Sequence, residues 1–170
     1  LELMRAHGLC AADIERIQCH VHQGAIDVLG PVTDPRTVHQ SKFSMGFVLA
    51  QIALTGRAGL GEFTEASLRD AAVRDLAARV DMALDPEIDR AWPQRWIGRV
   101  VVTTRDRRTL EARVETPKGD PGNTLSRAEL EEKALRLAGW ANAASATEMR
   151  TLIERCWRLR EEPHVRAWLA

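Results

Sequence analysis

Hydrophobic and polar residues alternate in two parts of the chain with the period of a half-buried strand. The first part is residues 14–22, where three apolar side chains would share one face: Ile17, Cys19 and Val21. The second part consists of residues 97–104 and 109–115, two β-branched or alternating runs on either side of the polar segment Arg105–Arg108. This pattern predicts one early strand and a later antiparallel hairpin with one wet face.

Apolar residues at helical spacing fill much of the region between these strands. One helix is expected after Ser44, capped by Ser41 or Ser44, and its inward stripe would be Met45, Val48, Leu49 and Ile52. A second helix is expected to open at Thr64 as N-cap, with a stripe of Leu68, Ala72, Leu76 and Val80. Asp85 and Pro86 would separate this helix from the segment that follows.

Both ends of the chain are also predicted to be helical. Ser126 and Glu129 form a capping box, from which a helix is expected to run to about Ala138 and to end at Gly139. A last helix would start near Thr147, and Trp168 in the tail after it is a candidate anchor. Residues 1–4 carry a helical pattern without a capping residue, so we expect residues 1–10 to be the end of a helix that began upstream.

The order of these elements predicts an α+β fold, because strands and helices are only partly interleaved and the hairpin is antiparallel. A loop rich in Pro and Gly covers residues 117–123. We therefore expect an α+β domain with a small antiparallel-containing sheet over residues 1–122, followed by C-terminal helices over residues 123–170.

Composition and charge narrow the function classes. Lysine plus arginine number 24, and aspartate plus glutamate also number 24, so no net charge attracts nucleic acid. The basic segment Arg105–Arg108 has no interleaved aromatic residues, and a solvated turn is favoured over a phosphate contact. No apolar run reaches the ~20 residues that span a bilayer. The odd number and wide spacing of Cys10, Cys19 and Cys156 favour reduced thiols in a cytoplasmic protein.

The richest candidate chemistry lies in the segment Thr37–Phe47, where a polar turn leads into an apolar helix. The free amides and the positive dipole end of a helix start favour an anion, and Lys42 would strengthen that preference. Ser44 would supply a hydrogen-bond donor, and His39 a base or a donor. A small molecule with a carboxylate would suit this place. The competing interpretation is structural, because most capped helix starts beside a lysine bind nothing.

Two other groups of residues favour structural interpretations. His20 and His22 lie two residues apart and would share one face of the early strand, but no third metal ligand is near. A solvated polar face is therefore favoured over a metal site, and no metal is expected. Trp92 and Trp96 are expected to lie over the sheet as an apolar cluster rather than to form a ligand cage. By themselves, these residues do not name a reaction.

Several segments resemble signatures of the MmgE/PrpD family. Ser41–Phe47, followed by an apolar helix and Gly56, resembles the family's "AKFSLPY…ALL.G". Five further segments match in order and at fitting spacing, over nearly the whole chain: Ile14–His22 ("I..V.V.VH"), Phe63–Glu65 ("FTE"), Val80–Asp85 ("V….D"), the hairpin ("V.V.L.DGR….V") and Gly119–Lys133 ("G.P.NPLS..EL..KF"). The hairpin turn departs from the pattern, with Asp106-Arg107 where "DG" is usual.

The resemblance implies an enzyme of the lyase or isomerase type that acts on small di- and tricarboxylates. Known types are methylcitrate dehydratase, cis-aconitate decarboxylase and iminodisuccinate epimerase, which transfer a proton beside a carboxylate without metal or organic cofactor. Family members are commonly homodimers with a helical domain and a smaller α+β lid. Residues 1–122 would be the lid, and residues 123–170 would return to the helical domain, whose catalytic Lys and His would lie upstream of Leu1.

The resemblance also implies that Lys42, Ser44, His39 and Phe47 bind substrate from the lid side. Phe47 stands where several relatives have Tyr, and Phe43 stands where the dehydratase and decarboxylase types have His. These departures leave the substrate open. Because half of the cleft would lie upstream, the 170 residues alone are expected to be inactive. The alternative from another class is a non-catalytic scaffold or dimerisation module that retains the lid fold.

Overall fold

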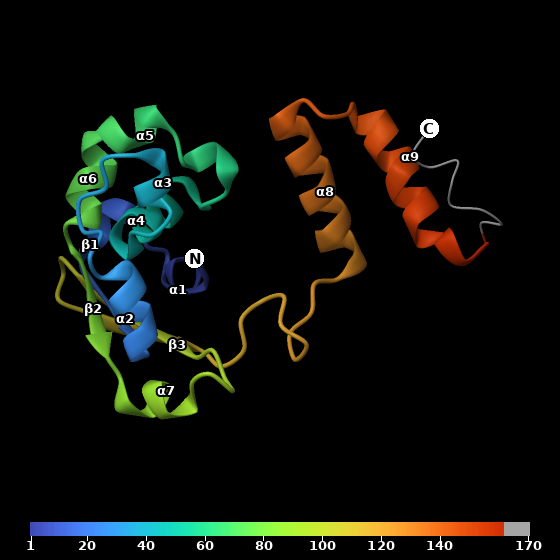
Figure 1. The fold of residues 1–170 in the computed structure, drawn as a ribbon. Coiled ribbons are helices and arrows are strands. Elements are labelled where there is room, and N and C mark those ends of the chain that lie inside the picture. Colours follow the sequence, from blue (N-terminus) through green and yellow to red (C-terminus); the bar gives the residue numbers. More distant parts are fainter. Residues whose placement is uncertain (162–170) are drawn as a thin grey trace. The chain divides into compact units, whose positions relative to one another are not determined.

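The computed structural model describes residues 1–161 and divides the chain into two compact units, residues 1–122 and residues 123–170 (Figure 1). Trp168, the candidate anchor, lies outside the described residues.

The first unit contains four strands and several helices, which confirms the predicted α+β class. In chain order these elements are α1 (Glu2–His7), β1 (Ile14–Val21), α2 (Gln23–Leu29), α3 (Val38–Ser41), α4 (Met45–Thr55), α5 (Glu65–Arg69), α6 (Ala71–Ala77), β2 (Val80–Leu84), α7 (Pro86–Ala91), β3 (Gly98–Thr104) and β4 (Thr109–Val114). Short 3-10 turns lie at Ala11–Asp13 and Leu60–Glu62. Gly8 ends α1 in the left-handed conformation, at φ 62°.

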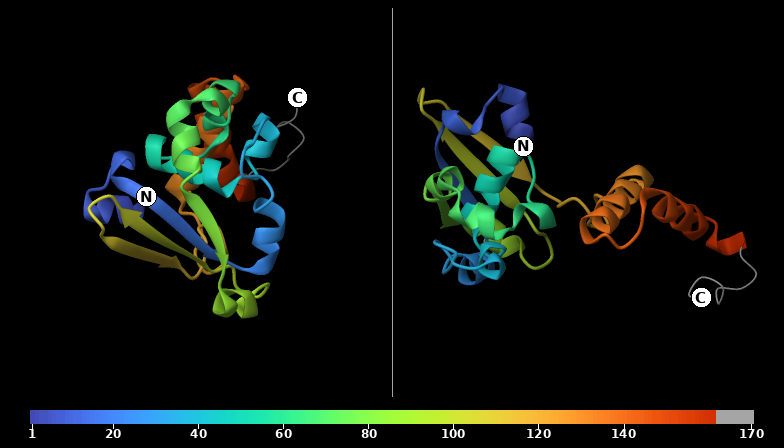
Figure 2. Two further views of the ribbon diagram at one scale, coloured as in Figure 1. Left: turned by 90° about the vertical axis from the view of Figure 1, so that its left-hand side faces the viewer. Right: turned by 90° about the horizontal axis from the view of Figure 1, so that it is seen from above.

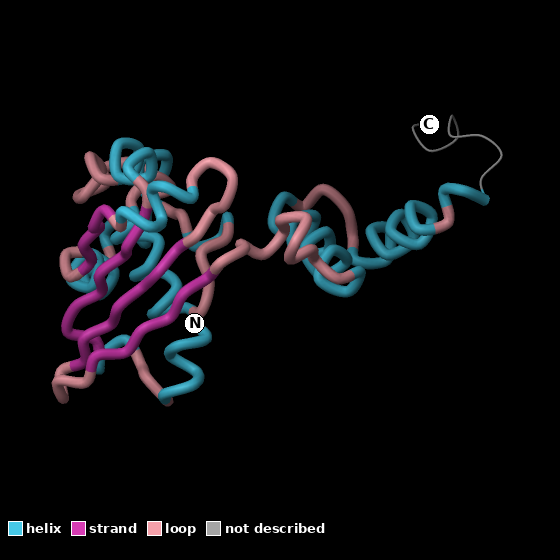
Figure 3. Tube along the Cα trace, turned by 90° about the horizontal axis from the view of Figure 1, so that it is seen from below, coloured by secondary structure: helices cyan, strands magenta, loops and turns pink. Residues whose placement is uncertain are grey.

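The four strands form one mixed sheet in the order β2-β1-β3-β4 (Figure 3). The hairpin of β3 and β4 is antiparallel, and β1 pairs antiparallel with β3. β2 pairs parallel with β1, with Ile17 opposite Val80 and Val21 opposite Leu84. The predicted strand and hairpin are therefore confirmed, while β2 is an addition that local periodicity did not reveal.

The two faces of this sheet differ sharply. On one face, Ile17, Cys19 and Val102 are buried in a core shared with α1, α4, α5 and α6. The other face carries ion pairs between neighbouring strands, such as Arg16 Nε to Asp81 Oδ2 at 2.7 Å. All three cysteines are free, as predicted. The pKa of the Cys19 thiol is raised to about 12, mainly by burial and in second place by the negative charge of Asp81.

Helix α4 faces the core with a different set of residues from the predicted stripe. Phe47, Ala50 and Gln51 are its buried residues, whereas Met45, Val48, Leu49 and Ile52 are only half-buried. Met45 and Leu49 do pack against the core, as predicted, whereas Val48 and Ile52 are not among its packed residues. The stripe was therefore only partly correct, because nearly every position of this helix is apolar and spacing alone did not identify the inward face. The ring of Phe47 instead packs against Phe63, with ring centroids 6.0 Å apart.

The second predicted helix is two helices and a strand. The chain breaks at Asp70, whose carboxylate accepts from the amides of Ala72 and Val73 and so caps α6 while it ends α5. Val80 leaves the helical stripe and begins β2. The i+4 spacing of apolar residues continues across the break at Asp70 and across the start of β2, because Leu68, Leu76 and Val80 all pack in the same core. Helices α4 and α6 pack side by side (Figure 2).

The second unit is a pair of helices, α8 (Arg127–Ala141) and α9 (Ala146–Trp157), that pack on each other, followed by a 3-10 turn at Leu159–Glu161. The capping box that opens α8 is confirmed: Ser126 N donates to Glu129 Oε2 at 2.7 Å, and Glu129 N donates to Ser126 Oγ at 3.2 Å. The helix passes through Gly139 and ends at Asn142, which takes the left-handed conformation instead.

The guanidinium of Arg127, at the start of α8, lies 4.8 Å from the ring centroid of Trp157, at the end of α9. No residue of either helix is buried. Large apolar side chains therefore stand exposed on this unit: Leu130, Leu137, Trp140, Leu152, Trp157 and Leu159.

Candidate functional site

Two capped helix starts follow each other in the segment Thr37–Phe47. Thr37 Oγ1 accepts from the amide of Gln40 at 3.1 Å and opens the single turn of α3. Two residues after Lys42 ends α3, Ser44 Oγ accepts from the amide of Phe47 at 3.4 Å and opens α4. Ser44 is thus the cap of α4, one of the two predicted candidates. The other, Ser41, uses its hydroxyl to donate to the carbonyl of Val38 at 2.8 Å.

Gly46 lets this helix start lie against α6. A Cβ atom at position 46 would come 2.7 Å from the carbonyl oxygen of Ala77, a distance at which the two atoms overlap. Only a residue without a side chain allows so close an approach of two backbones. The position of the turn around Lys42 therefore depends on Gly46, because the chain passes from Lys42 directly into α4.

The structure separates the four predicted binding residues into an exposed pair and a buried pair. His39 and Lys42 are exposed, and the Lys42 amide donates to the carbonyl of His39 at 3.2 Å. Ser44 is 1% exposed and Phe47 is 2% exposed. The imidazole of His39 contacts the half-exposed ring of Phe43, with centroids 5.2 Å apart. Within residues 1–161 the ammonium of Lys42 forms no ion pair.

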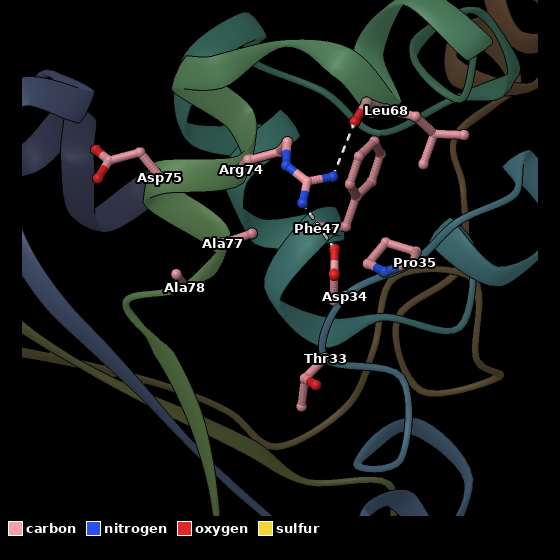
Figure 4. Close-up of a pocket in the computed structure, with 9 residues that line it drawn as sticks. All are labelled: Thr33, Asp34, Pro35, Phe47, Leu68, Arg74, Asp75, Ala77 and Ala78. Carbon is pink, nitrogen blue, oxygen red and sulfur yellow. Dashed lines mark hydrogen bonds and ion pairs between the residues drawn. The ribbon is translucent and has the colours of Figure 1, made fainter.

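A cavity of about 320 Å³ lies beside Phe47 (Figure 4). It is lined by Thr33, Asp34, Pro35, Phe47, Leu68, Arg74, Asp75, Ala77 and Ala78. The guanidinium of Arg74 donates to Asp34 Oδ1 at 3.0 Å and to the carbonyl of Leu68 at 3.5 Å. An anionic ligand in this cavity would have to replace Asp34 on Arg74, so the cation of the cavity is already engaged.

Sequence reasoning missed the pair of Arg74 and Asp34. Arg74 lies on the outer face of what was predicted to be one continuous helix, and Asp34 lies in an irregular connection 40 positions earlier. The only local signal was the Asp-Pro step at 34–35, which marks a turn but not its partner. Asp34 also pairs with the neighbouring Arg36, at 2.5 Å.

His22 is not part of a solvated strand face, and that prediction was wrong. The strand ends at Val21, and His22 is the N-cap of α2, where its Nδ1 accepts from the amide of Ala25 at 3.2 Å. The imidazole is buried because it stacks on Trp92, with centroids 5.0 Å apart, and meets the edge of Trp96 at 5.7 Å. The two tryptophans thus pack around one histidine rather than simply lying over the sheet.

His20 belongs to a separate polar cluster at the same end of β1. A terminal nitrogen of Arg99 lies 3.0 Å from His20 Nδ1 and 3.1 Å from Asp85 Oδ2. Burial acts to raise the pKa of Asp85, but the first amides of α7 and the Arg99 guanidinium together hold it below its ordinary value. Within the described part of the chain, no three His, Cys, Asp or Glu side chains are placed to hold a metal ion.

The basic hairpin turn is engaged in local contacts. Arg105 Nε donates to the carbonyl of Ala12 at 2.9 Å, and Arg108 Nε donates to Asp106 Oδ2 at 2.7 Å. Arg107 has φ 68°, in the left-handed region that favours glycine. All four residues of the turn are exposed, which fits the predicted solvated turn.

Comparison with known proteins places the chain in one family. The model of the MmgE/PrpD C-terminal domain matches residues 1–159. No curated protein matches the chain. Among residues 1–161, no helix is long and apolar enough to cross a membrane.

Proposed function

The chain belongs to the MmgE/PrpD family, whose C-terminal domain it carries, and we propose that it forms the C-terminal, lid-side part of an enzyme acting on small di- or tricarboxylates. The family includes dehydratases and decarboxylases. In the proposed reaction a proton is removed from or delivered to a carbon beside a carboxylate, without a metal or an organic cofactor. Such a step needs cations and hydrogen-bond donors that hold the carboxylates and stabilise the charge that develops.

The observation that carries this proposal is the exposed ammonium of Lys42 directly before the amide-rich start of α4. Several arginines of the same unit are already paired with carboxylates, such as Arg74 with Asp34 and Arg113 with Glu87. Lys42 forms no ion pair within the described residues, and α4 adds the positive end of its dipole beside it. An incoming carboxylate would therefore meet a cation that does not have to exchange a partner.

The four residues have different proposed roles. Lys42 and His39 contact the substrate, since both are exposed and follow each other on one turn. Ser44 fixes the start of α4 through its cap, and Phe47 contributes the wall of the neighbouring cavity. Phe47 has no hydroxyl and cannot transfer a proton, so in this proposal that step falls to other groups of the complete active site.

Proposed partners follow from the same assignment. The exposed apolar residues of α8 and α9, Trp140 among them, suit a helical domain of the same protein and a homodimer. These exposed side chains also favour the second candidate function, a non-catalytic scaffold or dimerisation module. Three free cysteines fit a cytoplasmic location.

Calorimetric titration with succinate and with citrate tests the proposal on the longest form of the protein that can be expressed. Lys42→Ala is expected to weaken binding about tenfold, because it removes one charge-assisted contact, and to leave the melting temperature unchanged. Lys133→Ala, at an exposed lysine of α8, is the matched control and should bind like the wild type.

Two results would count against the proposal. If Lys42→Ala binds both acids as tightly as the wild type and melts at the same temperature, Lys42 is not a ligand contact. If no small polycarboxylate binds to the wild type, and none is depleted or exchanges a proton with solvent, the scaffold function is favoured instead.

A further inference from the structure

Strand β4 forms one edge of the sheet, and among the described residues no strand pairs with its outer side. The Thr104 amide donates to the carbonyl of Arg108 at 3.0 Å, so the backbone of Arg108 faces β3. Residues that face a partner strand alternate with residues that do not, so the N–H and C=O groups of Thr109, Glu111 and Arg113 point away from β3. Helix α1 lies near β4 but forms no backbone hydrogen bond with it. The outer edge can therefore accept a further strand.

The two faces of β4 carry different side chains. Leu110 and Ala112 pack against the core, and Val114, which follows them at the same spacing, is 47% exposed. Glu111 and Arg113 alternate with these residues and so lie on the other, open face of the sheet. An added strand would cover Val114 and would meet one negative and one positive charge.

The order of these charges selects one register for a second copy of the chain. A two-fold axis at Ala112 places Glu111 opposite Arg113 of the second copy on both sides of the axis, and Leu110 opposite Val114. Opposite charges stabilise such a cross-strand pair, and like charges destabilise it. An axis at Glu111 or at Arg113 would set like charges against each other, and an axis at Leu110 would pair neither charge with its opposite. The sequence of β4 is thus complementary to itself in one antiparallel register.

We propose that two copies of this chain pair antiparallel through β4, with the two-fold axis at Ala112, so that one sheet continues through both copies. Backbone hydrogen bonds hold the two strands together. Both charges already have partners on their own chain, Glu111 with Arg99 and Arg113 with Glu87, so the new pairs fix the register more than they add affinity. This contact uses the first unit, whereas the homodimer proposed above uses α8 and α9, and it does not depend on a ligand at Lys42.

Sedimentation equilibrium of the 170-residue chain measures the pairing. A six-residue edge buries less surface than a stable dimer interface, so the dissociation constant should be on the order of 100 µM. Glu111→Arg creates two like-charge pairs across the axis and should weaken the pairing at least about tenfold. Adding Arg113→Glu restores opposite charges and should return the constant to within about threefold of the wild type. Glu15→Arg, the same change at an exposed residue of the inner strand β1, is the matched control and should dimerise like the wild type.

Disulfide cross-linking tests the register, and it decides the case even where a charge variant does not fold. The exposed Cys10 and Cys156 are first replaced by serine. Ala112→Cys then places two thiols opposite each other across the axis, with Cα atoms about 4.5 Å apart, which suits a disulfide. Glu111→Cys is the matched control, because its two copies would be diagonal neighbours about 7–8 Å apart. Air oxidation should therefore link the Ala112→Cys chains at least about tenfold faster.

Four results would overturn the proposal. The first is a wild-type chain that stays monomeric at about 1 mM. The second is a dimer that Glu111→Arg does not weaken, which would be held by another surface such as α8 and α9. The third is a folded charge-swapped variant that does not regain the pairing. The fourth is an Ala112→Cys chain that cross-links no faster than Glu111→Cys.

Discussion

Replacing Gly46 by alanine tests whether the close approach of α4 and α6 positions the Lys42 turn. The new Cβ would lie 2.7 Å from the carbonyl oxygen of Ala77. Ordinary contact starts at 3.4 Å, so one helix would have to move by the difference, 0.7 Å. The atom in the way belongs to the backbone of α6 and cannot rotate aside, so the movement would disturb a packed core that includes Phe47 and Leu76.

Two effects of opposite sign decide the result. Glycine to alanine inside a helix normally stabilises by about 1 kcal/mol, because alanine restricts the unfolded chain. Overpacking of a closed core costs about 1–3 kcal/mol, and a rigid backbone neighbour puts this site at the upper end of that range. Gly46→Ala should therefore destabilise the first unit by about 2 kcal/mol, which lowers its melting temperature by about 8 °C.

Urea unfolding followed through amide signals of β1 and β3 measures this change, because it reports on the first unit alone. Gly139→Ala is the control for helix propensity: a Cβ at position 139, inside α8, meets nothing within 4 Å. That variant should stabilise α8 by about 0.5–1 kcal/mol. If Gly46→Ala is as stable as the wild type or more stable, the backbone contact does not limit the packing of α4.

Two further variants test contacts of the sheet. Asp85→Asn removes a carboxylate whose pKa is held low, against the effect of burial, by the first amides of α7 and by Arg99. The carboxylate stabilises the fold above about pH 4, and this contribution is lost as the pH falls through the lowered pKa. The urea midpoints of variant and wild type should therefore differ near pH 6 and converge near pH 2. An equal difference between the midpoints at both pH values would contradict this. Arg107→Gly should raise stability in urea by about 0.5–1 kcal/mol, because glycine tolerates φ 68°. Arg105→Gly, the control, loses the hydrogen bond to Ala12 and should be less stable; equal effects of the two would contradict the conformational account.

The parts of the fold that could be predicted from the sequence are those set by neighbouring residues. The hairpin shows a β-branched run before a polar turn and an alternating run after it, and the capping box of Ser126 and Glu129 is complete within four residues. These signals are local, so the tertiary structure does not change them. The strand β2 was missed for the opposite reason: Val80 pairs with Ile17, far away in the sequence, and its spacing also fits a helix.

The candidate site was only partly predicted, again because the sequence indicates contacts between neighbouring residues and not contacts between distant ones. The cap by Ser44 depends on a contact three residues away, and the sequence was sufficient to propose it. The burial of Phe47 and Gln51 depends on which side of an almost wholly apolar helix meets the sheet, and spacing does not specify that side. The pair of Arg74 and Asp34 joins residues that no pattern connects. His22 was placed on a strand because alternation continued one residue past the point where the chain turns into α2.

The segment Thr37–Phe47 combines two kinds of position, and this mixture governs how variants of it must be interpreted. Ser41, Ser44 and Phe47 are buried, so a change at any of them acts first on the cap or the core. His39 and Lys42 are exposed, so a change there leaves the core intact and acts on whatever binds. A loss of binding is evidence for a ligand contact only at the exposed positions. At the buried positions the same loss follows from a displaced helix start, and only an unchanged stability of the first unit would assign it to the ligand.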